Sequence, residues 1–284
     1  KTISIYRNIG DFQNYKKIKE IKVNSIEDLY FEDTTMNGVC GEDIIYFVVS
    51  NTELSKSIKR NKSNYTENNK PENPKMLRLS VDDGKLVVNW EKSVSLDVDY
   101  YTISRKADGA YTWEEIISYI PNDSTSYIID SAYCQNYSDF DYYNFKVFCV
   151  DSCGNESYKY AEDFMSPIKL TSVEYDNCNK LTFKWYDDYS LSDTKGYIIN
   201  ILNYANDTIF SEKVESTSLS SDLFLYDLNI NDPNFVGTLN CNVSAYNDKG
   251  EIANSCFKEV VIENISEPPL YYEIVGERIG THWQ

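Results

Sequence analysis

The residues that could carry out catalysis are few in this chain, because it has a single histidine, His282, in the sequence GTHWQ. A Ser-His-Asp triad, a His-rich zinc site and most general-base mechanisms need a histidine next to a nucleophile or a metal. We interpret His282 as a terminal or linker residue rather than a ligand. The sequence therefore predicts a protein that is not an enzyme, with no catalytic residue, no cofactor and no hydrolase, transferase or redox activity.

The seven cysteines could bind a metal or form disulfides. None forms a C-x-x-C pair, and the nearest approach is the C-x-x-x-C of Cys149 and Cys153, so we predict no metal site. Cys149 and Cys241 fall on strand positions expected to face inward, where a free thiol packs as a small apolar side chain. The odd number argues against a fully paired secreted framework. Thiols kept reduced in a cytosol, or one unpaired cysteine in a secreted chain, would both account for it. The others are Cys40, Cys134, Cys178 and Cys256.

Acidic clusters could hold calcium, which binds several carboxylate and carbonyl oxygens. No segment follows the twelve-residue D-x-D-x-D-G-x₅-E loop, so we favour solvated loop charge, with structural calcium as the alternative. The clusters are Asp82 with Asp83, Asp97 with Asp99, and Asp187 and Asp188 with Asp193.

The overall charge limits the partners. The chain of 284 residues has 45 acidic and 27 basic residues, a formal net charge of -18, and a polyanion repels phosphate backbones and anionic lipid headgroups. The densest apolar run, Ile44 to Val49, has the length of a strand and is far from the roughly 20 residues that span a bilayer. We expect no nucleic-acid partner and no membrane insertion of this segment.

The elements that would position these side chains repeat along the sequence. The segments KLVVNW, ending at Trp90, and KLTFKW, ending at Trp185, are 95 residues apart, and the turn glycines Gly154 and Gly250 are 96 apart. Such a period fits one sandwich of roughly 100 residues, so we predict an all-β fold with complete modules at 75–166 and 167–266. The positions expected to face inward are Leu86, Val88, Trp90, Phe145, Val147 and Cys149, and then Leu181, Phe183, Trp185, Cys241, Val243 and Ala245.

A third, partial copy is predicted over residues 1–56. The sequence ISIYR, ending at Arg7, matches TISR, ending at Arg105, and IYFVVSNTELSKS matches FKVFCVDSCGNES, so this copy begins at its third strand. A sandwich without its first two strands exposes its inner face. We expect that face to be covered by upstream residues of the same polypeptide or by a strand from a neighbouring subunit.

The remaining segments have their own signatures. Residues 57–74 are polar and end in Pro-containing turn chemistry, which predicts a linker.

Residues 267–284 are predicted to be a C-terminal tail or the start of a further element. The candidate assembly strand in this tail consists of Tyr271, Tyr272, Ile274 and Val275, which favour β-structure, with Pro268-Pro269 holding it extended.

The patterns L-x-V/F-x-W, Y-x-I and Y-x-F-x-V-x-C/A followed by D/N-x-x-G-x-x-S resemble fibronectin type III modules, especially the bacterial and bacteriophage kind. The resemblance covers residues 75–265 and part of 1–56, and it implies tandem immunoglobulin-like β-sandwiches. It also implies core positions for Trp90 and Trp185 and a corner hydrogen bond from Tyr143. Leu239 and Asp43 occupy the corner position in the other two copies.

The resemblance implies a non-enzymatic function. We expect a structural or adhesion element of a phage tail, virion or bacterial surface fibre, located on the virion or outside the cell. Its partners would be neighbouring subunits or other domains of the same polypeptide, with a host or surface glycan as a further option. The alternative is a set of glycan-binding modules serving a larger secreted enzyme. Tyr111 and Trp113 bear on this choice, as an exposed stacking surface for sugar or a partner, or as residues packed on the sandwich edge.

Overall fold

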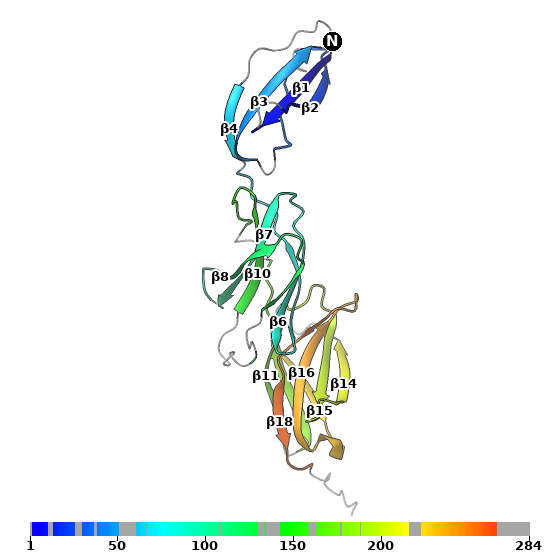
Figure 1. The fold of residues 1–284 in the computed structure, drawn as a ribbon. Coiled ribbons are helices and arrows are strands. Elements are labelled where there is room, and N and C mark those ends of the chain that lie inside the picture. Colours follow the sequence, from blue (N-terminus) through cyan, green and yellow to red (C-terminus); the bar gives the residue numbers. More distant parts are fainter. Residues whose placement is uncertain are drawn as a thin grey trace, which may run out of the picture. The chain divides into compact units, whose positions relative to one another are not determined.

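The protein is all-β in the computed structural model (Figure 1). The described residues are 2–10, 14–25, 30–36, 39–50, 61–66, 68–107, 109–129, 134, 143–158, 163–176, 178–187, 189–215 and 223–265. The chain divides into two compact units, which are residues 1–77 with 88–127 and 142–165, and residues 78–87 with 128–141 and 166–284.

The first module is a single antiparallel sheet with the order β2-β1-β3-β4. Its strands are β1 (Thr2–Ile9), β2 (Lys16–Lys22), β3 (Cys40–Ser50) and β4 (Asn61–Thr66). Strand β4 lies inside the residues 57–74 that we predicted to be a linker, and it pairs with β3 from Cys40 to Tyr46.

The second module has two three-stranded sheets. One has the order β5-β6-β9 and the other β10-β7-β8. The rings of Trp90 and Tyr101, one from each sheet, meet edge to face at 5.6 Å, so the two sheets pack against each other. The strands are β5 (Lys75–Asp82), β6 (Lys85–Glu91), β7 (Val98–Ala107), β8 (Glu114–Pro121), β9 (Ser126–Ile129) and β10 (Tyr143–Asp151).

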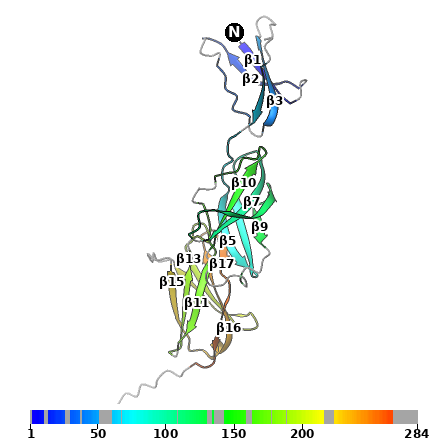
Figure 2. The same cartoon turned by 90° about the vertical axis from the view of Figure 1, so that its left-hand side faces the viewer.

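The third module repeats this plan, and Figure 2 shows its strands from a second side. One sheet has the order β11-β12-β15, and the other has β14-β13-β16 with both β17 and β18 paired to β16. The strands are β11 (Lys169–Tyr175), β12 (Lys180–Tyr186), β13 (Gly196–Leu202), β14 (Thr208–Glu215), β15 (Leu223–Asn229), β16 (Gly237–Tyr246), β17 (Ile252–Asn254) and β18 (Lys258–Ile262).

The strand order confirms the predicted fold class. In the second and third modules the first, second and fifth strands form one sheet, while the third, fourth and sixth form the other, as in immunoglobulin-like sandwiches. In the same plan a seventh strand pairs with the sixth, as β17 and β18 pair with β16 in the third module. The first module's sheet has the order of the fourth, third, sixth and seventh strands. These are tandem fibronectin type III-like sandwiches, two with both sheets and one represented from its third strand onward.

The predicted inward positions are buried. In the third module Leu181, Phe183, Cys241 and Val243 are completely buried, and Trp185 is 2% exposed. Strand β10 departs from the predicted alternation, because its outward residues Lys146 and Phe148 are also nearly fully buried.

The predicted register of the first copy is wrong by one residue in β3. Strand β1 places Ile5 opposite Val48, while β7 places Ile103 opposite Val147. Val48 therefore occupies the position of Val147, which the sequence match had given to Phe47. A shift of one residue moves every side chain of a strand to the other face.

Two consequences follow from this register. Tyr46 and Val48 share a face with Ile5, whereas Phe47 stacks on Tyr6 at 4.7 Å on the opposite face. The residue at the corner position is Ile44 and not Asp43, because Ile44 pairs with Ile9.

Strand β5 is also bonded to the third module, within the second compact unit. The Leu79 amide donates to Ser190 O at 2.8 Å. The Asn254 amide donates to Ser80 Oγ at 2.9 Å, and Asn254 Nδ2 donates to Asp82 Oδ1 at 3.0 Å. Residues 78–87 therefore belong to the same compact unit as the third module.

Candidate functional site

The first sheet carries an open groove of about 460 Å³ on one face. The period of two along each strand brings apolar side chains from all four strands to this face. Segment 30–36 forms one wall. The lining residues are Ile3, Ile5, Ile21, Phe31, Asp33, Met36, Ile44, Tyr46, Val48 and Tyr65.

This face is less well covered than the same face of the other modules. Val147 and Val243 are fully buried at their positions in the second and third modules, but Val48 is only half-buried. Among the described residues, no second sheet belongs to the first module. The groove therefore leaves apolar side chains in contact with water, which is typical of a binding surface.

A hydrogen-bonded cluster holds segment 30–36 on the sheet. Arg7 Nη1 forms an ion pair with Asp33 Oδ2 at 2.7 Å, and Tyr46 Oη donates to the same oxygen at 2.8 Å. The Thr35 amide and hydroxyl donate to Asp33 Oδ1 at 3.0 and 2.7 Å. The Arg7 and Asp33 side chains are only 15% and 8% exposed.

Burial and hydrogen bonding shift the pKa values of two groups in this cluster. Burial alone would raise the pKa of the Asp33 carboxyl, but hydrogen bonds from Thr35, Tyr46 and Arg7 outweigh burial and lower it. Burial and the hydrogen bond to Asp33 raise the pKa of Tyr46 to about 12. Both pKa values move away from neutral pH, whereas a general acid or base needs one near it.

We expect acid to loosen the first module through Asp33. Because the pKa of Asp33 is lowered from 3.8 on folding, its ionisation stabilises the module above pH 4, and this contribution disappears as the pH falls through the lowered pKa. Hydrogen exchange of peptides from β1 and β3, corrected for its intrinsic pH dependence, should show this loss. In Asp33→Asn the module should be less stable at pH 7, and its difference from the native chain should vanish in acid. A constant difference would contradict the assignment.

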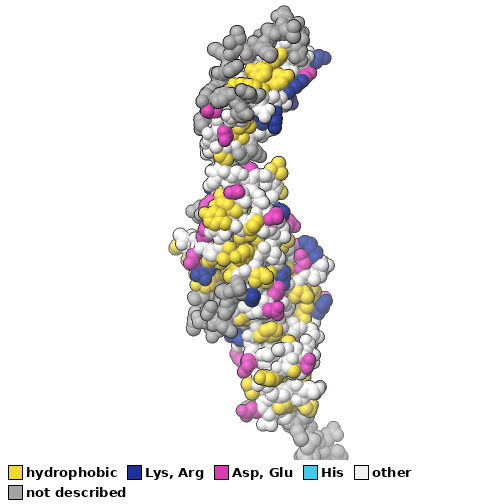
Figure 3. Space-filling model, in the orientation of Figure 1, with side chains coloured by type: hydrophobic (Ala, Val, Ile, Leu, Met, Phe, Trp, Pro, Cys, Tyr) yellow, Lys and Arg dark blue, Asp and Glu magenta, His cyan; other side chains and the backbone are white. Residues whose placement is uncertain are grey.

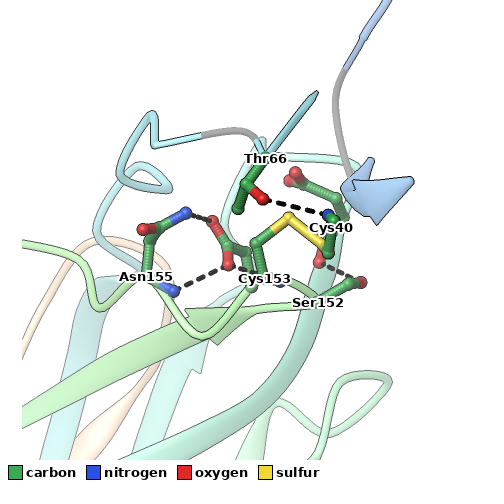
Figure 4. Close-up of a disulfide and its surroundings, with 8 residues drawn as sticks. Cys40, Thr66, Ser152, Cys153 and Asn155 are labelled. Atoms are coloured by element: carbon green, nitrogen blue, oxygen red, sulfur yellow. Dashed lines mark hydrogen bonds between the residues drawn. A yellow bond between two sulfur atoms is a disulfide. The ribbon is translucent and has the colours of Figure 1, made fainter. Parts of the chain in front are cut away.

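Cys40, at the start of β3, forms a disulfide with Cys153 in the turn after β10 (Figure 4). The carboxylate of Asp151 organises this turn by accepting from the amides of Cys153 and Asn155, each at 2.8 Å. Gly154, with φ of 81°, provides the left-handed residue that the turn needs. The disulfide therefore attaches the first module to a rigid turn of the second.

The second disulfide joins Cys134 to Cys256, which lies between β17 and β18. Of the remaining cysteines, Cys149 and Cys241 are buried and unpaired, as expected for small apolar side chains, and Cys178 is exposed. Four cysteines are thus paired and three are not, so neither a fully reduced set nor a single unpaired cysteine describes the chain.

The aromatic residues proposed as a ligand surface have different environments. Tyr111 is 96% exposed. Trp113 is half-buried, with its ring edge to face on Phe148 at 6.0 Å and the ammonium of Lys106 over it at 5.1 Å. Trp113 therefore helps to cover the outer face of β10.

The acidic clusters are engaged in local hydrogen bonds where the structure describes them. Asp82 accepts from Arg78 at 2.7 Å and from Ser80 at 2.6 Å, and Asp187 accepts from the Ser190 amide at 2.9 Å. Within the described ranges, no group of three or more acidic, His or Cys side chains is placed to hold a metal. Asp188, His282 and the predicted assembly strand lie outside the described residues.

Similarity to known proteins is found among solved structures. No protein-family profile and no curated protein matches the chain. Among solved structures, the chain is similar to the FN1–FN3 domains of chicken CNTN1, with a TM-score of 0.34, 14% identity and coverage of 93% of this chain and 90% of that one. It is also similar to the chicken interferon gamma receptor alpha chain, with a TM-score of 0.28, 10% identity and coverage of 68% and 98%. In the described part of the chain, no helix has the length and apolar character to cross a membrane.

Proposed function

We propose that this chain is a non-enzymatic interaction element that binds an extended protein segment through the groove of its first module. The observation that carries this proposal is the apolar sheet face of about 460 Å³. In the complete sandwiches the corresponding face is buried. The open face of the first module has the same apolar character, so it can pack against another apolar β-strand. The role is assembly or attachment in a phage tail, virion or bacterial surface fibre.

The two disulfides support a location outside reducing compartments. Disulfides persist in extracellular, periplasmic and surface environments and are rare in a reducing cytosol. One of them connects the first module, which carries the groove, to the second. We therefore place the working protein on the surface of a particle or cell.

The glycan-binding alternative has less support. A sugar-binding platform presents aromatic ring faces to solvent, but Trp113 packs on Phe148 and lies under Lys106. Tyr111 is the exposed member of the predicted pair.

Selection of a peptide library against the whole oxidised chain tests the proposal. We expect enriched peptides with apolar residues at alternate positions, whose binding falls at least tenfold in Val48→Asp. Tyr65→Ala, at the other side of the groove, serves as a milder second variant. The matched control is Val261→Asp in the third module, where the side chain is 55% exposed. Selected peptides that bind all variants equally, or glycan-array binding that requires Tyr111, would contradict the proposal.

A further inference from the structure

We propose that the groove of the first module receives residues 270–275 of a second copy of this chain. This inference rests on the proposed function, because it names the partner of the same groove. It combines the open apolar face with the basic charge along its edge and the sequence of the tail.

The groove has space and chemistry for one strand. Its floor follows β1, where Ile3 and Ile5 lie opposite Ser50 and Val48 of β3. The eight residues of β1 span about 27 Å at 3.4 Å per residue, and a six-residue strand spans about 20 Å.

One edge of this sheet is basic in a chain that is otherwise acidic. Strand β2 has four Lys and one Glu in seven residues, whereas the whole chain has a net charge of -18. Lys19 pairs with Ile5 and Ile21 pairs with Ile3, so Lys19 lies on the face that carries the groove. Figure 3 shows exposed hydrophobic side chains of the first module beside Lys and Arg side chains. A partner with apolar residues and negative charge is complementary to this face.

The tail has that composition. Residues 267–284 contain three Glu and one Arg, and the segment LYYEIV carries one of these Glu residues among apolar ones. In an extended conformation, Leu270, Tyr272 and Ile274 would share one face and could enter the groove together. Glu273 would lie on the other face, and its negative charge would be attracted to the basic edge through space. Pro268-Pro269 favours an extended entry into this strand.

The resulting contact would be head to tail. The surface that receives and the segment that inserts are different parts of the chain, so each copy can bind one neighbour and be bound by another. Such contacts do not close on themselves unless the rotation between copies brings the ends together. They therefore suit the growth of a fibre.

Sedimentation of the oxidised chain over a range of concentrations is the first test. We expect concentration-dependent oligomers for the native chain and for Val261→Asp, and monomers for the chain lacking 267–284 and for Val48→Asp. Hydrogen exchange in β1 and β3 will show that the first module stays folded in each variant. If Val48→Asp unfolds it, Tyr65→Ala replaces that variant.

A synthetic peptide of residues 267–284 supplies the second test. It should bind the tail-deleted chain, and Lys19→Glu should weaken this binding at least fivefold. The opposite change in the peptide, Glu273→Lys, should weaken binding to the native groove and restore binding to the Lys19→Glu chain. Three outcomes would each overturn the inference. They are oligomers that persist without the tail, a peptide that does not bind, and a monomer whose own tail protects its groove from hydrogen exchange. If library peptides still require Val48 when this peptide fails, the proposed function stands and the inference alone is wrong.

Discussion

Trp185→Ala is expected to lower the free energy of unfolding of the third module by about 3–5 kcal/mol. The indole is 2% exposed, stacks on Phe224 at 5.5 Å and meets Tyr197 edge to face at 5.3 Å. Its removal leaves a cavity between the two sheets, which the surrounding strands can close only in part. Denaturant unfolding followed by far-UV circular dichroism and hydrogen exchange will measure the loss.

Trp185→Phe is the control. The Nε1 atom of Trp185 is buried without a hydrogen-bond partner, so replacement by phenylalanine forfeits no hydrogen bond and should cost less than the alanine variant. Equal losses in the two variants would show that the packing of the ring does not determine the effect.

Trp90→Ala extends this test to the relation between modules. The sequence alone predicts that each tryptophan stabilises only its own sandwich. The bonds from β5 to Ser190 and Asn254 indicate instead that loss of either module weakens the other by a smaller amount. Identical unfolding curves for both alanine variants would mean that the two modules form one cooperative unit.

Removal of the Cys40–Cys153 disulfide has the second large expected effect. The bond closes a loop with a sequence separation of 113, and loop-closure entropy then contributes about 4–5 kcal/mol. The buried apolar residues described in the first module are Ile5, Met36, Val39, Ile44 and Ile45, so little other burial replaces this contribution. In Cys40→Ser with Cys153→Ser, we expect proteases to digest the first module while the third resists.

Cys178→Ser is the matched control, because Cys178 is exposed and unpaired. It should leave the protease pattern unchanged. A doubly substituted chain whose first module stays as resistant as that of the native chain would show that its sheet is stable without the bond.

The fold class could be predicted from the sequence because the buried tryptophans and turn glycines repeat at nearly equal spacing. Leu181, Phe183 and Trp185 alternate with polar residues along a strand that has only one buried face. Strand β3 offered no such contrast. Its run from Ile44 to Val49 is apolar at every position, so neighbouring registers fit the pattern equally well, and pairing with β1 decides between them.

The candidate site was harder to predict than the fold. Asp33 lies in a segment without strand periodicity, and its contact with Arg7 joins residues 26 positions apart. The disulfides could not be assigned because seven cysteines allow many pairings and spacing does not choose among them. The clue available for Cys153 was its position in the D-x-x-G turn, where Asp151 and Gly154 fix the backbone.

The two disulfides together limit how far the chain can be stretched. They overlap, because Cys134 precedes Cys153, so the shortest covalent route from Lys1 runs through Cys40, Cys153, Cys134 and Cys256 to Gln284. This route has about 90 residues and extends to about 300 Å, whereas the unlinked chain would extend to about 1000 Å. Under tension, the crosslinks therefore act as a tether that shields much of all three modules from the load. A fibre built from such chains would recoil after stretching as long as its disulfides stay oxidised.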